Sequence, residues 1–260
     1  MMSNEPKKPS NVRAAEAAFE AELEHFRMQA EGVVQFLATY LTIHMTAAHN
    51  AAVHRMLNGS ALYWSTVLGA LQQSAFITLG RIFDQGSEHN IDRLIGLAQA
   101  RPSLFSRDAL RSRKRASGLT DPEKLDGFMA TTYEPSADDF RTVRVKIAHR
   151  REVYERNYHP LRNQHFAHSE TIDRSEVDAL FAQTNVGELQ ELLDFACALH
   201  GALWGLYFNG TRPTLRLSKD GTSPQMRNLH DQVGLETEAL LCKLAGVKPG
   251  FDSEPGAHDE

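Results

Sequence analysis

The chain has 260 residues, a formal net charge of −5 and a hydrophobic content of 42%, which is enough apolar material for a buried core. The longest apolar run, residues 192–208, includes Asp194 and His200. It is shorter than the roughly 20 residues of a membrane span and predicts a buried core helix. The N-terminal residues lack the apolar segment of a secretory signal, and Cys197 and Cys242 fit no metal or disulfide spacing. We therefore expect a cytoplasmic protein without a membrane segment.

The negative net charge hides a basic middle segment. Residues 101–165 hold 14 Lys and Arg against 9 Asp and Glu, so this segment carries +5 and the rest of the chain carries −10. A basic segment on an acidic chain is suited to an anion such as RNA. The alternative is a solvated helical face that happens to be basic.

Apolar residues recur at helical spacing through the first hundred residues. After a polar leader over residues 1–10, the pattern predicts a helix capped by Asn11 and a second helix over residues 33–45. Asn58-Gly59 predicts a break, with Ser60 as the cap of an apolar helix that ends near Gln85-Gly86. Further on, Asn90 starts a short helix over residues 91–100, which Pro102 closes.

The middle of the chain combines a short helix over residues 103–116 with a stretch, residues 117–135, that loses all periodicity. That stretch contains glycines and prolines and predicts a mobile loop. Ser136 and Asp139 resemble a capping box, which predicts a helix from there to about Asn157.

The last part of the chain is again helical by pattern. Helices are expected over residues 175–183, 186–208 and 223–246, and only residues 214–218 alternate like a strand. The fold class is therefore an all-α bundle. The expected organisation is a disordered leader, a helical bundle, a C-terminal helical extension and a disordered acidic tail, over residues 1–10, 11–210, 211–246 and 247–260.

Several common sites are absent from the sequence. It has no phosphate-binding glycine-rich loop, no G-x-S-x-G and no cysteine-based zinc signature. His44, His49 and His54 are five residues apart, so successive members lie about 140° apart on a helix and do not share a face. We expect no metal and no cofactor.

One stretch, PLRNQHFAHS over residues 160–169, brings together Arg162, Asn163, His165 and His168. Arginine and histidine can cleave RNA without a metal, because histidine moves protons near neutral pH and arginine stabilises charge on phosphorus. The Arg-to-His spacing itself carries no weight, since about three such pairs are expected by chance and two are present. Pro160 predicts that Arg162 and Asn163 lie at a helix N-terminus, which suits a phosphate.

The choice between the two histidines depends on how many chains form the site. On an ideal helix His165 lies about 60° from Arg162 and His168 about 120° away, so geometry within one chain favours His165. Across a two-fold axis each helix needs only to aim its own side chains into a shared groove, and His168 becomes equally suitable.

Two segments carry a family resemblance: YHPLRNQHFAHSE (residues 158–170) and LGRIFDQGSEHNIDRLI (residues 79–95). They resemble the HEPN superfamily (higher eukaryotes and prokaryotes nucleotide-binding) and, within it, the abortive-infection branch related to AbiU, whose signature is Arg-Asn-x-x-x-Ala-His. The resemblance spans about residues 20–210. It implies a HEPN-like helical bundle, here with appended N- and C-terminal helices, that dimerises in parallel around the signature helices.

The resemblance also implies metal-independent endoribonuclease activity, as in many members of the superfamily. It makes Arg162 the phosphate contact, His168 the acid/base and Asn163 an orienting residue, and it selects His168 over His165. HEPN toxins silenced by nucleotidyltransferase antitoxins carry a tyrosine two residues after the histidine. Glu170 stands there in this chain, which argues against that mode of control.

The expected function is a homodimeric endoribonuclease of the phage-defence or toxin-antitoxin type, with an antitoxin or regulatory protein as a further partner. Four cations in the basic segment are candidates for RNA binding: Arg111, Arg113, Lys114 and Arg115. Arg81 and Asp84 are expected to pair on one helix face. The alternatives are a non-catalytic HEPN-like module that binds RNA, a nucleotide or a partner protein, and a purely structural helical protein.

Overall fold

The computed structural model describes residues 9–163, 184–215 and 224–249, and within these ranges every regular element is a helix. The predicted all-α class is confirmed. The elements are α1 (Pro9–His49), α2 (Ala51–Gly59), α3 (Ala61–Phe83), α4 (Ile91–Ala100), the 3-10 helix η1 (Pro102–Phe105), α5 (Arg107–Ala116), α6 (Pro122–Ala130), α7 (Ala137–Asn157), α8 (His159–Leu161), α10 (Val186–Asn209) and α11 (Pro224–Ala245). In this described part, none of the helices has the length and apolar character needed to cross a membrane.

The longest element is α1, a single helix of 41 residues with a length of roughly 60 Å. It replaces the two helices expected over residues 11–45, and it begins at Pro9 rather than at an Asn11 cap. Its buried residues continue at helical spacing from Phe26 through Ala30 to Val33. The continuous apolar face explains why the two predicted helices are joined.

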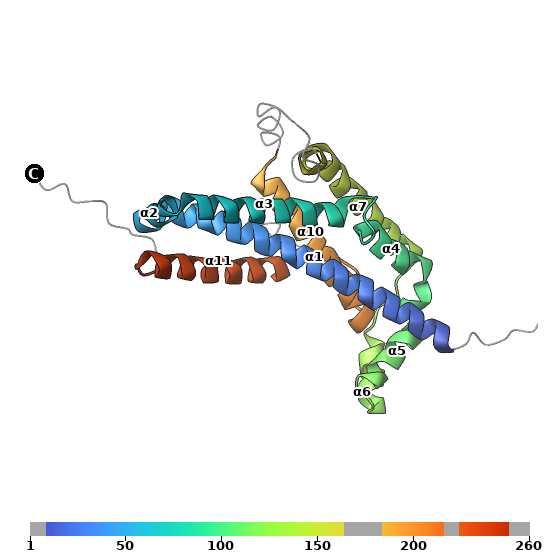
Figure 1. The fold of residues 1–260 in the computed structure, drawn as a ribbon. Coiled ribbons are helices and arrows are strands. Elements are labelled where there is room, and N and C mark those ends of the chain that lie inside the picture. The colour runs from blue at the N-terminus through green and yellow to red at the C-terminus, as the bar shows by residue number, and fades with distance from the viewer. Residues whose placement is uncertain (1–8, 164–183, 216–223, 250–260) are drawn as a thin grey trace, which may run out of the picture.

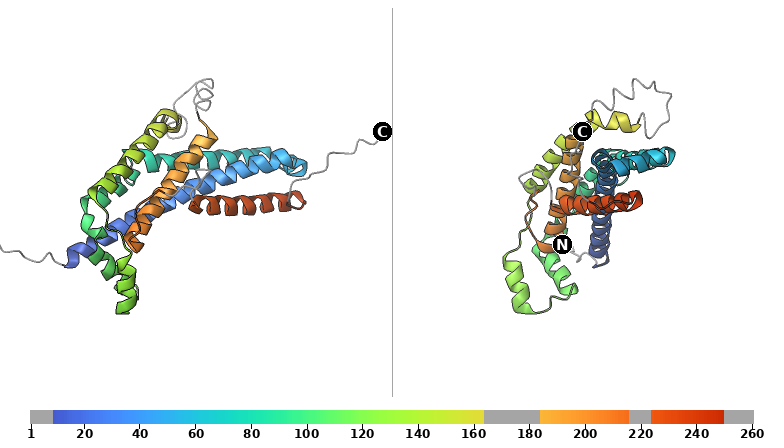
Figure 2. Two further views of the ribbon diagram at one scale, coloured as in Figure 1. Left: turned by 180° about the vertical axis from the view of Figure 1, so that it is seen from behind. Right: turned by 90° about the vertical axis from the view of Figure 1, so that its left-hand side faces the viewer.

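The other helices are arranged along α1 in two groups (Figure 1). At one end α3 and α11 lie along α1 to form an elongated arm whose tip carries α2. At the other end α4 and α10 pack against the first half of α1, α7 packs against α4 and α10, and α5 and α6 project to one side (Figures 1 and 2). The main core lies where α1, α3, α4, α7 and α10 meet. A smaller core at the arm tip contains Ile43, Val53, Leu241 and Cys242.

Helix α10 is the predicted core helix, and almost all of its residues from Leu192 to Tyr207 are buried. Asn185 caps its start by accepting hydrogen bonds from the amides of Gly187 and Glu188. Gly210 ends it in the left-handed region with φ 60°, a conformation that glycine adopts at little cost. The predicted ends of this helix are thus confirmed.

The prediction of a loop over residues 117–135 is wrong, because α6 lies inside it. Asp121 accepts a hydrogen bond from the amide of Lys124, and Pro122 stands in the first turn, where its missing N–H costs nothing. Leu125 and Met129 share one face and pack against Leu110 of α5 in a third small core. Helix α6 has nine residues, with Leu125, Phe128 and Met129 as its large apolar side chains, and it is shorter than the window of roughly 11–18 residues in which a helical period is recognised.

Most other predicted boundaries agree with the structure. The capping box of Ser136 and Asp139 is present, and Asn90 caps α4. The break at Asn58-Gly59 is also present, although the Ser60 side chain makes no capping hydrogen bond. A further break at Asn50 was not predicted. The Asn50 side chain accepts hydrogen bonds from the amides of Ala52 and Val53 and so caps α2. The helix expected over residues 175–183 and most of the expected strand lie outside the described residues.

Candidate functional site

The described part of the signature stretch follows directly from the end of α7. Helix α8 has three residues, with Pro160 in its first turn, and the amide of Arg162 donates a hydrogen bond to the carbonyl of Tyr158 at 2.9 Å. The expectation that Arg162 lies at an anion-binding helix N-terminus is therefore wrong, because its amide is already bonded. Any contact of Arg162 with an anion must come from the guanidinium.

The two signature histidines, His165 and His168, lie outside the described residues, as do the other residues of 164–183. The geometry of the candidate site therefore rests on Arg162, Asn163 and the residues that surround them.

Arg162 pairs with Asp84, the residue that caps the end of α3. Its Nη1 lies 3.1 Å from Asp84 Oδ2, and the side chains are 25% and 13% exposed. The expected pair between Arg81 and Asp84 is wrong. Asp84 has an extended backbone with φ −68° and ψ 128°, so its side chain leaves the face of α3 on which Arg81 lies exposed.

This ion pair belongs to a ring of four polar side chains, which Asn163 and His159 complete. The Nη1 of Arg162 also donates to Asn163 Oδ1 at 2.6 Å, and Asn163 Nδ2 lies 2.9 Å from His159 Nε2. His159 Nε2 is in turn 3.8 Å from Asp84 Oδ1. Asn163 can therefore orient Arg162, and it connects the ion pair to the imidazole of His159.

Gly80 on α3 provides the space in which Arg162 lies. A Cβ atom at this position would come within 2.9 Å of Arg162 Nε and 3.2 Å of both Asp84 Oδ2 and the Tyr154 hydroxyl. Tyr154 comes from α7, and its pKa is raised by burial and by the nearby negative charge of Asp84. Only glycine lets these three polar groups approach the helix so closely.

Three polar atoms around Gly80 are buried without a hydrogen-bond partner among the described residues: Asp84 Oδ1, Arg162 Nε and the Tyr154 hydroxyl. Unpaired buried polar atoms are rare and often mark a functional site. Gly80, Tyr154 and His159 were not predicted as site residues from the sequence. Gly80 was the feature of the sequence that could have indicated this site, because a glycine inside an apolar helix usually has a packing or functional reason.

A polar cavity of about 700 Å³ opens beside this ring. Its lining includes Arg162 and His159 on one side, the turn after α3 from Asp84 to Ser87, and Glu155 of α7. The Arg162 guanidinium thus forms part of the wall of a space large enough for a phosphate with its ribose. Within the described ranges, no group of three or more His, Cys, Asp or Glu side chains is placed to hold a metal ion.

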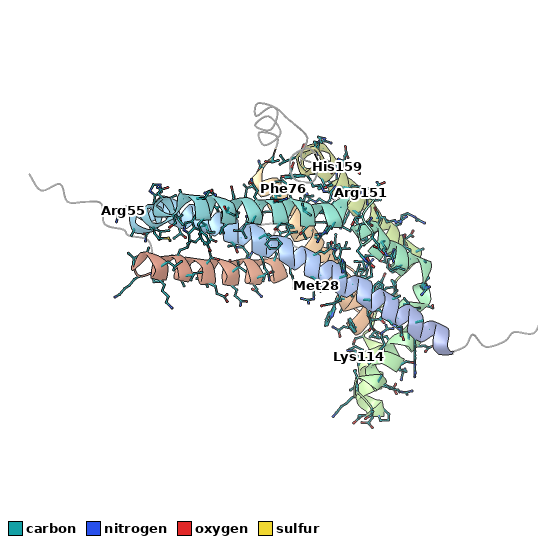
Figure 3. All side chains as sticks on the ribbon, in the orientation of Figure 1. Met28, Arg55, Phe76, Lys114, Arg151 and His159 are labelled. Atoms are coloured by element: carbon teal, nitrogen blue, oxygen red, sulfur yellow. The ribbon has the colours of Figure 1, made fainter. Side chains whose placement is uncertain are left out.

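The cations of α5 are mostly engaged within the protein. Arg113 is 13% exposed, pairs with Glu16 at 3.0 Å and lies 3.9 Å above the Tyr207 ring. Lys114 donates to Asn209 at 3.0 Å, and Arg111 pairs with Asp126 at 2.5 Å. Arg115 is exposed. The structure does not bring these residues to Arg162, since Lys114 and His159 lie on opposite sides of the molecule (Figure 3).

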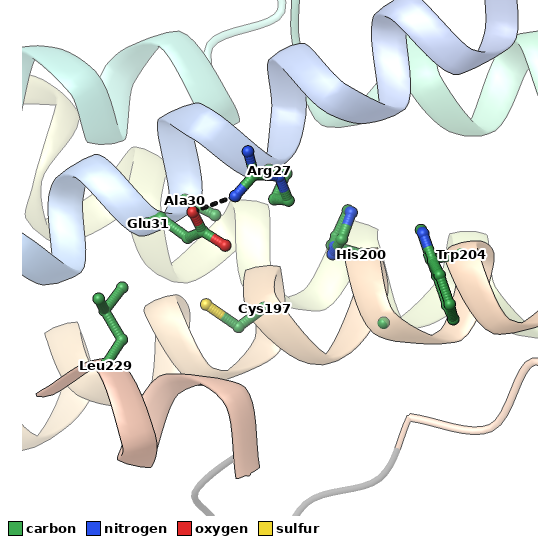
Figure 4. Close-up of a pocket in the computed structure, with 8 residues that line it drawn as sticks. Arg27, Ala30, Glu31, Cys197, His200, Trp204 and Leu229 are labelled. Carbon is green, nitrogen blue, oxygen red and sulfur yellow. Dashed lines mark hydrogen bonds and ion pairs between the residues drawn. The ribbon is translucent and has the colours of Figure 1, made fainter. Parts of the chain in front are cut away.

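A second cavity of about 280 Å³ lies between α1, α10 and α11 (Figure 4). Its lining includes Arg27, Glu31, His200 and Trp204. Arg27 is neutralised by contacts with Glu24 and Glu31, and burial lowers the pKa of His200 to about 4. The cavity therefore offers no free positive charge at neutral pH, and it is a poor site for a phosphate.

The chain was compared with known proteins. A protein-family model, HEPN_AbiU2 (described as AbiU2), matches residues 16–223, a span that includes Asp84, Arg162 and all the candidate site residues. No curated protein and no solved structure matches the chain.

Proposed function

The chain belongs to the HEPN AbiU2 family, and we propose on that premise that it is a metal-independent endoribonuclease of the phage-defence or toxin type. The resemblance seen in residues 79–95 and 158–170 is confirmed at the level of the family. The single observation that carries the proposal is the position of Arg162: its guanidinium lines a polar cavity and is oriented by Asp84 and Asn163.

In the proposed reaction a base removes the proton from a ribose 2′-hydroxyl, and the 2′-oxygen attacks the adjacent phosphorus. The 5′-oxygen leaves with a proton from an acid, so the products carry a 2′,3′-cyclic phosphate and a 5′-hydroxyl. Arg162 stabilises the charge on the phosphate. His168 acts as acid or base, with His165 as the alternative.

One histidine fills only one of the two proton-transfer roles. We propose that a second copy of the chain supplies the other histidine in a homodimer whose signature segments face each other. The substrate is unpaired RNA, because attack in line with the leaving group needs a flexible backbone. An endoribonuclease in the cytoplasm would damage cellular RNA unless it is inhibited. We therefore propose an antitoxin or regulatory protein as its partner.

The test is cleavage of a labelled single-stranded RNA in the presence of EDTA. Wild-type protein is expected to produce 2′,3′-cyclic phosphate ends, and Arg162→Ala and His168→Ala are each expected to lower the rate by about 100-fold or more. His165→Ala is the matched control with cleavage near that of wild type. Undiminished cleavage by His168→Ala, with wild-type helicity, would contradict the assignment.

The second candidate is a non-catalytic module that binds RNA. The observation that favours it is the Asp84 carboxylate at 3.1 Å from Arg162, because a neutralised arginine stabilises phosphorus charge less than a free one. RNA binding by a wild-type protein that does not cleave would support this candidate and reject the nuclease.

A further inference from the structure

The exposed face of α7 is a cation-rich surface that the function proposed above leaves unused. From Phe140 to Arg151 this helix contains four arginines and Lys146, together with His149, and no acidic residue. Because most cations of α5 form contacts within the protein, α7 is the stronger candidate for contact with a polyanion.

The cations of α7 divide into paired and unpaired groups. Arg150 pairs with Glu191 at 2.7 Å, Arg151 pairs with Asp92, and Arg141 pairs with Asp138. Arg144, Lys146 and His149 are exposed, and none of them makes an ion pair with another described residue. The positive charge of Arg144 and Lys146 is therefore not compensated within the described chain.

The unpaired side chains are spread across the exposed face. On an ideal helix Arg144 and Lys146 lie about 160° apart, one on each flank, and His149 lies about 60° from Lys146. Val145, which is 67% exposed, stands between the two flanks. A nucleic-acid backbone that crosses α7 at this level meets a cation on each side, and the long stems of arginine and lysine reach toward it.

The same helix leads to the candidate site. Arg144 and Arg141 line a groove of about 430 Å³ where α7 starts, and Glu155 near its other end lines the cavity beside Arg162. Arg144 and Glu155 are separated by 11 positions, which corresponds to about 16 Å along the helix. Arg151 and His159 mark this course on one side of the molecule (Figure 3). Glu152 pairs with Arg156 at 2.9 Å, whereas Glu155 makes no ion pair with another described residue, so an unpaired carboxylate stands beside the cavity.

We propose that the exposed face of α7, through Arg144, Lys146 and His149, binds the phosphate backbone of single-stranded RNA and guides it to Arg162. This inference rests on the proposed function and assigns RNA binding to α7 in place of α5. Binding through phosphates is independent of base sequence and depends strongly on salt.

The experiment measures binding of a fluorescent single-stranded RNA over a series of salt concentrations. All proteins carry His168→Ala, so that the RNA stays intact during the measurement. In this background Arg144→Gln with Lys146→Gln is compared with Lys243→Gln and Lys248→Gln, which remove the same charge from exposed positions at the end of α11 and beyond it. Figure 1 shows α11 in the arm, away from most of α7.

The α7 variant is expected to bind about tenfold more weakly, and the slope of log affinity against log salt is expected to fall by about 1.4. The α11 variant keeps the slope of its parent. An unchanged slope and affinity in the α7 variant, or no RNA binding by the parent, would overturn the inference.

Cleavage separates this inference from the nuclease. With His168 intact, the α7 variant is expected to show a raised KM and an unchanged kcat. If the protein binds RNA through α7 but does not cleave it, the inference is supported and the nuclease proposal is rejected. If cleavage and RNA binding are both unchanged in the α7 variant, the nuclease proposal is supported and the inference is rejected.

Discussion

Gly80 is the single residue on which the geometry of Arg162 depends most directly. In Gly80→Ala the new methyl group meets Arg162 Nε at 2.9 Å, so the guanidinium must move away from Asp84. We expect RNA cleavage to fall at least tenfold, while the helix propensity of alanine offsets most of the loss in the free energy of unfolding.

Gly69 on the same helix provides the matched control, because a Cβ there meets nothing within 4 Å. Gly69→Ala is expected to raise the free energy of unfolding by about 0.5–1 kcal/mol and to leave cleavage unchanged. Chemical denaturation and cleavage rates measured on both variants test the pair of predictions. Equal cleavage by the two variants would show that Gly80 does not position Arg162.

His200 makes stability depend on pH. Burial, and then the charge of Arg27, lowers its pKa from 6.5 to about 4 in the folded protein. Between these two values the unfolded chain binds a proton that the folded protein does not, so the free energy of unfolding falls as the pH drops from 6.5 to 4. The histidine contributes roughly 2 kcal/mol to this fall.

The comparison of wild type with His200→Gln isolates that contribution, since the glutamine does not titrate. Urea denaturation at pH 7, 5.5 and 4 is expected to show a smaller loss of stability in the variant. Parallel curves for the two proteins would mean that His200 is protonated at the same pH in the folded and unfolded states.

At the level of elements, α5 has a structural role that its basic sequence does not suggest. Arg113→Gln breaks the pair with Glu16 and removes the hydrogen bond to the carbonyl of Tyr207. Both acceptors, which are partly buried, then lose this donor. We expect a loss of about 2 kcal/mol in the free energy of unfolding. Arg115→Gln, on the exposed side of the same helix, is expected to change it by less than about 0.5 kcal/mol. Thermal denaturation compares the two, and an equal effect would contradict the structural role.

Helices with long apolar faces and strong caps were predictable from sequence, and those held together by distant contacts were not. The capping box at Ser136 and the end of the helix expected over residues 186–208 depend on local features, and both were predicted. The start of α6 also has a local cap at Asp121, but its two buried residues are buried by contact with Leu110 of α5, which is distant in the sequence. For the site, the signature located Arg162 and Asn163. The partnership of Arg162 with Asp84 depends on how α3 meets α8, which no local pattern encodes.

On the scale of the whole molecule, the proposed dimer predicts that one inactive subunit silences its partner. The proposed reaction takes one His168 from each protomer, so a mixed dimer of wild type and His168→Ala lacks one of the two proton-transfer groups. Mixing wild type with an excess of His168→Ala, with exchange of subunits, is therefore expected to lower cleavage well below that of the same amount of wild type alone.

The control for this experiment is the same amount of wild type mixed with an unrelated protein, which keeps its cleavage. Light scattering and a tagged subunit establish that subunits exchange. Undiminished cleavage after exchange would show that each site is complete within one protomer.

Helix α11 begins at Pro224, directly after the span that the family model matches. Yet Leu241 and Cys242 of this helix are fully packed against Ile43 of α1 and Val53 of α2. The span matched by the family model therefore ends before the segment that the folded arm needs for its core. A fragment trimmed to the family span would expose the apolar tip of the arm to water, and aggregation of that fragment would say nothing about whether the family's chemistry is intact.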